Sequence, residues 1–268
     1  MGTAAGGAIS IGAANTSGTP VSLVLSDVTL RHNRAIGGDG NTAGTFTAAT
    51  FLGTAWGGGL ECDDLGVGST TTVSNSVIAD NQAFGGQGAD GEDGADALGG
   101  GVANVFASAL TVSGSTFSDN HAVGGASRAG GNGGQGLGGG LFNDGPSTFP
   151  TNLGAPTILT VLDSRITNNE AEGGDAGNGG QGGDGLGGGL YVAGGSDTVT
   201  VTVADSRIEH NEAEGGDGGG HHHHNNGQGI GGGVYIAGGT VSIMNTEIKH
   251  NHADTSDDNV FGVFTTDC

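Results

Sequence analysis

The chain contains the stretch Leu186-Gly187-Gly188-Gly189-Leu190-Tyr191-Val192, which returns with small changes along most of its length. A weaker version, Gly6-Gly7-Ala8-Ile9-Ser10-Ile11, stands near the start. The other copies occupy positions 56–62, 98–104, 137–143 and 230–236. A stretch that recurs this often indicates a repeat architecture, so each residue has to be interpreted through its place in the repeat.

A second marker follows each copy: an apolar residue, two variable residues, Asn, one variable residue and Ala. Its spacing along the chain is uneven, which indicates a constant core interrupted by loops of different length. A side-chain amide at a corner can bond the same residue one turn above and below. We therefore predict a structural ladder made of Asn33, Asn81, Asn120, Asn169, Asn211 and Asn251.

Between the markers, apolar and polar residues alternate, as in Val199, Val201 and Val203 with threonines between them. This period of two is typical of a strand with one buried face. Each unit then has three short strands, and the shortest unit, 231–254, is long enough for one turn of a solenoid. We predict an all-β, right-handed parallel β-helix of about six three-strand coils, forming a single domain over residues 1–268.

The composition agrees with such a fold and limits the partners. The 268 residues include 62 glycines, and only 13% are charged, which suits stacked strands with a thin aliphatic interior. The formal net charge is −22, with 28 acidic and six basic residues. Nucleic acid is excluded as an expected partner because phosphate binding requires clustered Lys and Arg. Divalent cations are the natural partners of such a surface.

Cysteine usage and the N-terminal sequence bear on location. Cys62 and Cys268 make no disulfide framework, and Cys62 is expected to be a small buried thiol inside the first marker. The opening residues lack the basic and apolar runs of a secretory signal, and no stretch is long and apolar enough for a transmembrane segment. The chain begins almost inside its first repeat, so we expect a segment of a longer protein, with signal and anchor elsewhere.

The paired markers resemble a known family. Gly6-Gly7-Ala8-Ile9 and Phe117-Ser118-Asp119-Asn120 are similar to the Gly-Gly-Ala-Ile and Phe-x-x-Asn repeats of chlamydial polymorphic outer membrane proteins. The broader pattern resembles right-handed β-helix repeat proteins of the pectate-lyase-like superfamily. Most copies here read Gly-Gly-Gly and Ile-x-x-Asn, a looser match. The resemblance implies a secreted or surface-displayed bacterial protein, often adhesive.

Glycine-rich loops separate the second marker from the next first marker, always at the same corner. Three of them, 85–98, 124–137 and 173–186, have the same length of 14 residues, and glycine tends to recur at every third position. Period three is typical of an extended, polyproline-II-like chain. We therefore predict that the loops stack as an ordered layer at one corner; the alternative is that they remain flexible, as isolated Gly-rich chains are.

Acidic residues align between successive units and predict a Ca²⁺ site. The predicted ligands are Glu172, Asp175, Glu214, Asp217 and Asp254, with Glu170 and Glu212 in the adjoining column. Like charges one coil apart repel, and a bound cation relieves this repulsion. A second cluster comprises Asp90, Glu92, Asp93 and Asp96. The alternative is a solvated acidic face; Ca²⁺ is the only cofactor that the sequence suggests, and none is required.

Two further features suggest binding. The run His221, His222, His223 and His224 offers imidazoles for a transition metal, although adjacent residues do not easily close a tetrahedral site, and an adventitious flexible run is the alternative. Phe142, Tyr191 and Tyr235 occupy one position in three successive coils. Such a stripe can stack on sugar rings, or it can be a cross-coil ladder that stabilises the sheet.

The sequence also contains a group of candidate catalytic residues. Asp163 and Asp205 align one coil apart beside Arg165 and Arg207, the residue types that glycosidases and polysaccharide lyases use. Each of them lies within the repeated unit, whereas catalytic residues usually break the scaffold pattern. A ladder of opposite surface charges is the better explanation.

The sequence therefore predicts a non-catalytic, secreted or cell-surface β-solenoid that acts as a spacer, adhesin or matrix component and binds Ca²⁺ and glycans. The alternative is a polysaccharide lyase or glycoside hydrolase acting on an extended polysaccharide. Open strand edges at the ends of a solenoid also suggest end-to-end self-association into a filament.

Overall fold

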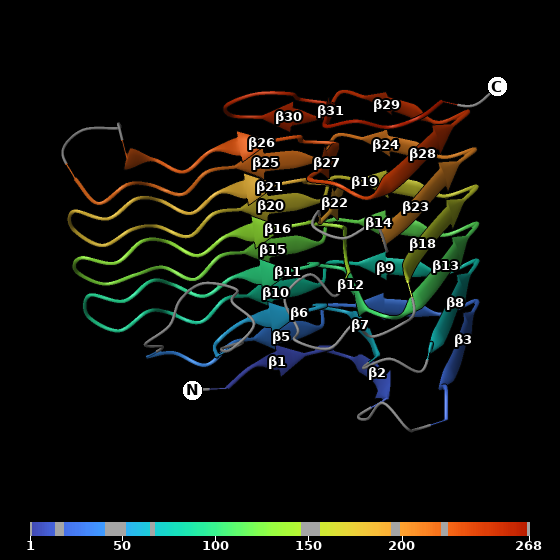
Figure 1. The fold of residues 1–268 in the computed structure, drawn as a ribbon, viewed down its shortest axis with the longest axis horizontal. Helices are drawn as coiled ribbons and strands as arrows, with labels where there is room; N and C mark the ends of the chain where they lie inside the picture. The colour runs from blue at the N-terminus through green and yellow to red at the C-terminus, as the bar shows by residue number, and fades with distance from the viewer. Residues whose placement is uncertain are drawn as a thin grey trace.

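The computed structural model describes residues 2–13, 19–40, 52–64, 68–145, 156–193, 199–220 and 225–266. These residues form five all-parallel sheets, which we name A to E in chain order, and contain no α-helix. Corresponding strands of successive turns lie side by side, so each sheet runs along the axis of a parallel β-helix (Figure 1). The predicted all-β parallel solenoid is confirmed.

Successive turns contribute one strand to each sheet, and sheet B has one strand more than the others. Sheet A contains β1 (Ala4–Ala5), β6 (Ala55–Trp56), β11 (Ala97–Leu98), β16 (Gly136–Leu137), β21 (Gly185–Leu186) and β26 (Gly229–Ile230). Sheet B contains β2 (Ile9–Ala13), β7 (Leu60–Asp64), β12 (Val102–Phe106), β17 (Leu141–Asp144), β22 (Leu190–Val192), β27 (Val234–Ile236) and β31 (Val260–Phe261). Sheet C contains β3 (Ser22–Ser26), β8 (Thr70–Ser74), β13 (Ala109–Ser113), β18 (Thr157–Leu162), β23 (Val199–Ala204) and β28 (Thr240–Met244).

The remaining two sheets carry the second marker. Sheet D contains β4 (Thr29–Arg31), β9 (Val77–Ala79), β14 (Thr116–Ser118), β19 (Arg165–Thr167), β24 (Arg207–Glu209) and β29 (Glu247–Lys249). Sheet E contains β5 (Arg34–Ile36), β10 (Gln82–Phe84), β15 (His121–Val123), β20 (Glu170–Glu172), β25 (Glu212–Glu214) and β30 (His252–Ala253).

Two of the three strands expected in each turn are thus divided in two. A glycine of the first marker, such as Gly99 with φ of 69°, adopts a left-handed conformation and separates sheet A from sheet B. The residue before each ladder asparagine, such as Asp119 with φ of 56°, does the same between sheets D and E. A left-handed residue turns the chain sharply, so a strand cannot continue through it.

The interior is a stack of aliphatic columns. Leu60, Val102, Leu141, Leu190 and Val234 face inward from sheet B, and Ile78, Phe117, Ile166 and Ile208 face them from sheet D, each with 0% exposure. A second row of alanines fills the narrow space between sheets A and E. These are the inward columns that the alternation predicts. Cys62 is a free, buried thiol of this core, and burial raises its pKa to about 12.

The glycine-rich loops form an ordered layer. Main-chain N–H groups of Gly85, Gly88, Gly91 and Gly94 donate to carbonyls of residues 123, 126, 129 and 132 in the next loop, at 2.7–3.0 Å. Bonding at every third residue is the pattern expected of extended helices with three residues per turn. The loops project side by side from one corner of the solenoid, as the left side of Figure 1 shows.

Each loop has two legs, an outgoing segment and a returning segment, and these are also hydrogen-bonded to one another. Gly134 N–H donates to Gly125 within one loop at 2.9 Å, and Gly174 N–H of the next loop donates to Gly134 at 2.8 Å. The same pattern recurs one loop further along, where Gly183 N–H donates to Gly174 within its loop and Gly216 N–H of the next loop donates to Gly183. The layer is therefore two legs thick and continuous across the described loops, and the prediction of an ordered layer is confirmed there.

Candidate functional site

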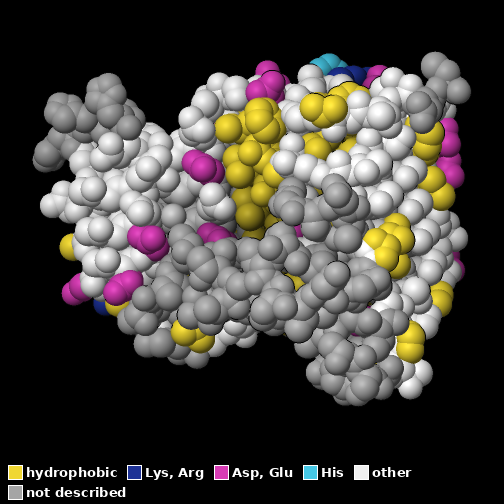
Figure 2. Space-filling view, viewed as in Figure 1, with side chains coloured by type: hydrophobic (Ala, Val, Ile, Leu, Met, Phe, Trp, Pro, Cys, Tyr) yellow, Lys and Arg dark blue, Asp and Glu magenta, His cyan; other side chains and the backbone are white. Residues whose placement is uncertain are grey.

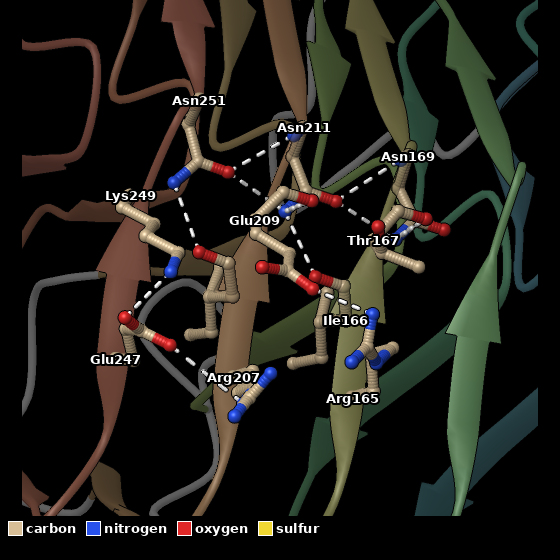
Figure 3. Close-up of polar contacts among 11 residues, drawn as sticks. Arg165, Ile166, Thr167, Asn169, Arg207, Glu209, Asn211, Glu247, Lys249 and Asn251 are labelled. Atoms are coloured by element: carbon tan, nitrogen blue, oxygen red, sulfur yellow. Dashed lines mark hydrogen bonds and ion pairs between the residues drawn. The ribbon is translucent and has the colours of Figure 1, made fainter.

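The asparagines of the second marker form a continuous ladder along the axis (Figure 3). Each amide nitrogen donates to the amide oxygen of the next asparagine, at 2.9 Å from Asn120 to Asn169 and from Asn169 to Asn211. The same oxygen also accepts the preceding asparagine's main-chain N–H, at 3.0–3.1 Å. Because Asn81, Asn120 and Asn169 are 0% exposed, these bonds replace water and serve the scaffold.

A second ladder, made of hydroxyl groups, runs beside the first. It is not among the features predicted from the sequence. Each hydroxyl oxygen accepts the main-chain N–H of its counterpart in the preceding turn, as in the 3.1 Å contact of Ser76 N–H with Ser115 Oγ. Its members are Ser76, Ser115, Ser164, Ser206 and Thr246. The signal was present, because Ser or Thr stands two residues before the apolar residue of the second marker in five of its copies.

The proposed catalytic set belongs to the scaffold. Asp163 and Asp205 have φ of 48° and 51° and form the turn between sheets C and D, where other turns place Asn75 or Gly114 with a left-handed conformation. Asp and Asn tolerate this conformation better than most residues, which explains their recurrence. Both aspartates therefore have a structural reason to be where they are.

The two arginines of that set are held by other carboxylates (Figure 3). Arg165 Nη1 lies 2.6 Å from Glu209 Oε1, and Arg207 Nε lies 3.7 Å from Glu247 Oε2. These partners stand on the neighbouring strands β24 and β29 of sheet D. The arginines thus form ion pairs between neighbouring strands, as the charge ladder requires, but their partners are Glu209 and Glu247 rather than Asp163 and Asp205.

The outer face of sheet E carries the strongest cluster of metal-ligating groups. His121 aligns with Glu170 on the next strand, and Glu170 and Glu172 align with Glu212 and Glu214 on the strand after it. Nε2 of His121 lies 3.0 Å from Oε2 of Glu172 and 3.6 Å from Oε1 of Glu170. Within the described residues, this is where three such groups converge closely enough to share an ion.

The pKa values of three glutamates on this face are shifted by burial and by the groups beside them. Burial and the neighbouring carboxylates raise the pKa of Glu170, although His121 opposes the shift. The pKa of Glu172 is lowered, first through its side-chain contact with His121. Burial, contact with Glu212 and the charges of Glu170 and Glu172 raise the pKa of Glu214 to about 7. The face therefore has an excess of negative charge that a cation would offset.

His121 was missed in the sequence because only carboxylates were compared between units. It fills the variable position between Asn and Ala of the second marker, where later copies have Glu170 and Glu212. Comparing that position for every metal-ligating residue type would have found it.

The remaining predicted Ca²⁺ ligands are engaged elsewhere. Asp175 Oδ1 accepts the Asp217 main-chain N–H at 3.0 Å. Asp254 accepts the N–H groups of Gly229 at 2.6 Å and Gly215 at 3.1 Å. Glu172 and Glu214 are thus the two members of the predicted set that stand together on the outer face of sheet E.

Carboxylates in the second acidic cluster join neighbouring loops. Asp93 Oδ1 accepts the Asn132 N–H and Asp96 Oδ1 accepts the Gln135 N–H, both at 2.7 Å. Each such bond links one loop to the next and satisfies a backbone donor of the layer. Asp90 is exposed near the loop tip, where no shared ligand geometry with Asp93 or Asp96 is found among the described residues.

The aromatic stripe is a stack of rings. Phe142 lies 5.3 Å from Tyr191, and Tyr191 lies 5.2 Å from Tyr235, with ring planes within 5° of parallel; Phe261 continues the stack at 4.7 Å. Leu98, Leu137 and Leu186 of sheet A pack against it. Figure 2 shows hydrophobic side chains gathered in a strip over this region. Because both faces of Tyr191 are covered by neighbouring rings, the geometry favours the stabilising ladder over a sugar platform.

A group of carboxyls with little access to water stands further along sheet B, where Glu61 and Asp144 are buried and Asp63 is partly buried. Glu61 and Asp63 point outward from β7, and Asp144 from β17 stands in the same column as Asp63, with Val105 between them. Burial raises the pKa of Glu61 and raises the pKa values of Asp63 and Asp144 to about 7. These residues depart from the repeat, since other turns place Ala103 and Val105 there.

Stability should therefore increase as the pH falls from 8 to about 5. The ordinary pKa of an aspartate is 3.8, so in this window the folded chain binds more protons at Asp63 and Asp144 than the unfolded chain does. The free energy of unfolding then decreases as the pH rises through the window. We expect the melting temperature to be roughly 3–10 °C higher at pH 5 than at pH 8.

Thermal unfolding followed by circular dichroism across this range measures the effect. Asp144→Asn should flatten the pH dependence, while Asp163→Asn at an exposed turn should leave it unchanged. A melting temperature that falls continuously from pH 8 to pH 5 would contradict the prediction.

The predicted metal-binding run of His221, His222, His223 and His224 lies outside the described residues, and so does Cys268. The described residues contain no helix long and apolar enough to cross a membrane. Comparison with protein-family models, with curated proteins and with solved structures finds no match.

Proposed function

We propose that the protein is a non-catalytic β-solenoid of the cell surface or extracellular space, acting as a rigid spacer that presents adhesive faces. The observation that supports this most is that each suspected catalytic group has a structural role. Asp163 and Asp205 form a left-handed turn that other coils form with Asn75 or Gly114, and Arg165 and Arg207 pair with Glu209 and Glu247 on the neighbouring strands. Catalytic groups usually break such a pattern.

Three further features support a spacer. The asparagine and hydroxyl ladders bond every turn to the next along the axis. The glycine-rich layer adds a second set of axial bonds outside the coil. The net charge of −22 keeps such a surface soluble, and its partners are expected to be cations, glycans or further copies.

The alternative function is polysaccharide cleavage, and one arrangement favours it. Asp63 and Asp144 share a column with one strand between them, so their backbones stand about 9.6 Å apart, twice the ordinary strand separation. Inverting glycosidases hold their two carboxyls roughly 6.5–9.5 Å apart, so the side chains of Asp63 and Asp144 would have to lean slightly toward one another to reach that range. The raised pKa of each group also suits a general acid.

Incubation with a panel of acidic and neutral polysaccharides separates these functions. For a spacer we expect no release of reducing ends or unsaturated products, and recovery of intact polysaccharide from any complex that forms. Turnover that disappears in Asp63→Asn and Asp144→Asn but persists in Asp163→Asn and Asp205→Asn would establish the enzyme instead. Turnover lost in the latter pair would mean that the turn aspartates are catalytic and would refute both assignments.

A further inference from the structure

We propose that His121, Glu170 and Glu172 form a binding site for a divalent transition-metal ion of the Zn²⁺ class on the outer face of sheet E. The three residues come from two adjacent strands, β15 and β20, whose register pairs His121 with Glu170. Ala122 and Ala171 between them are 0% exposed, so the alternation of each strand directs all three ligands to the same outer face.

The distances fit a shared ion. With metal–ligand bonds of about 2.1 Å, the ligand atoms of a tetrahedral zinc site lie about 3.4 Å apart. In the structure, His121 Nε2 lies 3.0 and 3.6 Å from the two carboxylate oxygens, one distance on each side of that value. All three ligand atoms lie within 4.8 Å of one another.

The His121 nitrogen is shielded and available. Nε2 has almost no solvent-accessible surface, and among the described residues no hydrogen bond reaches it. The two carboxylate oxygens lie 3.6 and 3.0 Å from it, yet neither forms a hydrogen bond with it. An ion held among the three atoms would complete the nitrogen's coordination and bind both oxygens.

The neighbouring carboxylates favour a bound cation, and no Lys or Arg side chain described on this sheet face lies close enough to pair with them in its place. Glu212 and Glu214 on β25 add two carboxylates beside Glu170 and Glu172. The nearest basic residue on this sheet face, Arg34, stands two strands from His121 and bonds Gln82 at 2.7 Å. A divalent cation therefore offsets a charge excess that the sheet itself does not neutralise.

The donor set selects the class of metal. Ca²⁺ prefers six to eight oxygen ligands, whereas one imidazole with two carboxylates is a combination that zinc accepts readily. Two protein strands supply three ligands, which leaves room for water or for a Glu212 or Glu214 oxygen as the fourth. The site shares Glu170 and Glu172 with the acidic columns expected to bind Ca²⁺, but it adds His121 and selects a different metal.

Titration calorimetry with ZnCl₂ on the EDTA-treated full chain tests the proposal. His221 to His224 are first replaced by serine, because adjacent imidazoles bind the same metals. We expect one equivalent of Zn²⁺ to bind, and Co²⁺ to bind competitively with a visible absorption band. His121→Gln and Glu172→Gln should each weaken binding at least tenfold, as the loss of one ligand from a three-ligand site requires.

His252→Gln provides the matched control. His252 lies on the same sheet face beside Glu212, and its Nδ1 is 3.6 Å from Asp258 Oδ1. The His252→Gln variant should bind Zn²⁺ as tightly as the protein that differs from it only in keeping His252. Undiminished binding in both His121→Gln and Glu172→Gln, equal loss in His252→Gln, or saturation by Ca²⁺ with no Zn²⁺ uptake would each overturn the site. Circular dichroism identifies any variant that fails to fold, and Glu170→Gln then replaces it.

Discussion

Replacing Gly183 with alanine is expected to lower the stability of the protein and to open the glycine-rich layer around it. An added Cβ would lie 1.8 Å from the carbonyl oxygen of Gly134 and 2.6 Å from its carbon, both backbone atoms of the neighbouring loop. Gly183 also donates to Gly174 and accepts from Gly216, both at 2.9 Å. Relieving the overlap must therefore displace backbone on more than one loop.

Overpacking of this kind costs about 1–3 kcal/mol and more where backbone has to move. At about 3 kcal/mol, the melting temperature of a chain of this size should fall by roughly 6–12 °C. Hydrogen exchange should accelerate at Gly174, Gly183 and Gly216, while the Asn ladder amides keep their protection. This pattern would locate the damage in the layer rather than in the coil.

Gly220→Ala provides the control, because a Cβ there meets nothing within 4 Å. Without overlap, replacing glycine by alanine reduces the entropy of the unfolded chain and stabilises by about 0.4–1 kcal/mol. The two substitutions should thus have opposite signs. Equal melting temperatures for Gly183→Ala and Gly220→Ala would mean that the layer does not form in solution.

Asn120→Ala is expected to be the second severe substitution. Oδ1 of Asn120 accepts the main-chain N–H of Asn81 at 3.1 Å and its side-chain N–H at 3.0 Å. Nδ2 donates to the Ile78 carbonyl at 2.9 Å. Alanine removes these partners at a site with 0% exposure, where water cannot replace them without opening the stack.

A buried group left without its partner costs about 1–3 kcal/mol. Asn81 Nδ2 keeps its bond to the Leu30 carbonyl, so the Asn81 main-chain N–H and the Ile78 carbonyl are the two groups that lose this partner. We expect a loss of about 2–5 kcal/mol and a melting temperature lower by roughly 5–15 °C. Asn33→Ala at the first rung is the matched control. Asn33 donates to Asn81 Oδ1, which keeps its bond from the main-chain N–H of residue 33, so the loss should be below about 1 kcal/mol.

Chemical denaturation of the two ladder variants, followed by circular dichroism, measures the difference. A cost for Asn33→Ala as large as that for Asn120→Ala would show that burial of the rung is not what makes it essential. A nearly neutral Asn120→Ala would show that the stack repacks around the missing amide.

Much of the scaffold could be predicted because its rules are local. The alternation of Val199, Val201 and Val203 places one face inward whatever the rest of the chain does. The recurring Asn sets the register of neighbouring turns, since a slip by one residue would place an amide in the aliphatic column. The equal loops of 14 residues likewise predicted that they could lie side by side.

The roles of individual charged residues were not predictable in this way. Asp175, Asp217 and Asp254 looked like cation ligands, yet Asp175 and Asp254 bond main-chain N–H groups, and Asp217 lies near the Asn226 amide at 3.4 Å. Whether a carboxylate meets an N–H group depends on how two loops stack, which no local pattern specifies.

By itself, the sequence determined the solenoid, its inward columns, the asparagine stack and the position of the loop layer. The alternation of apolar and polar residues acts within one turn, and the two markers recur at equivalent places in the next. Only the tertiary structure decided that His121 meets Glu170 and Glu172, that Asp144 is buried and that Asp63 is partly buried. His121 and Glu170 are 49 residues apart, and their side chains approach only through the separation of neighbouring strands. Distances between side chains and their access to water are properties of the stacked turns.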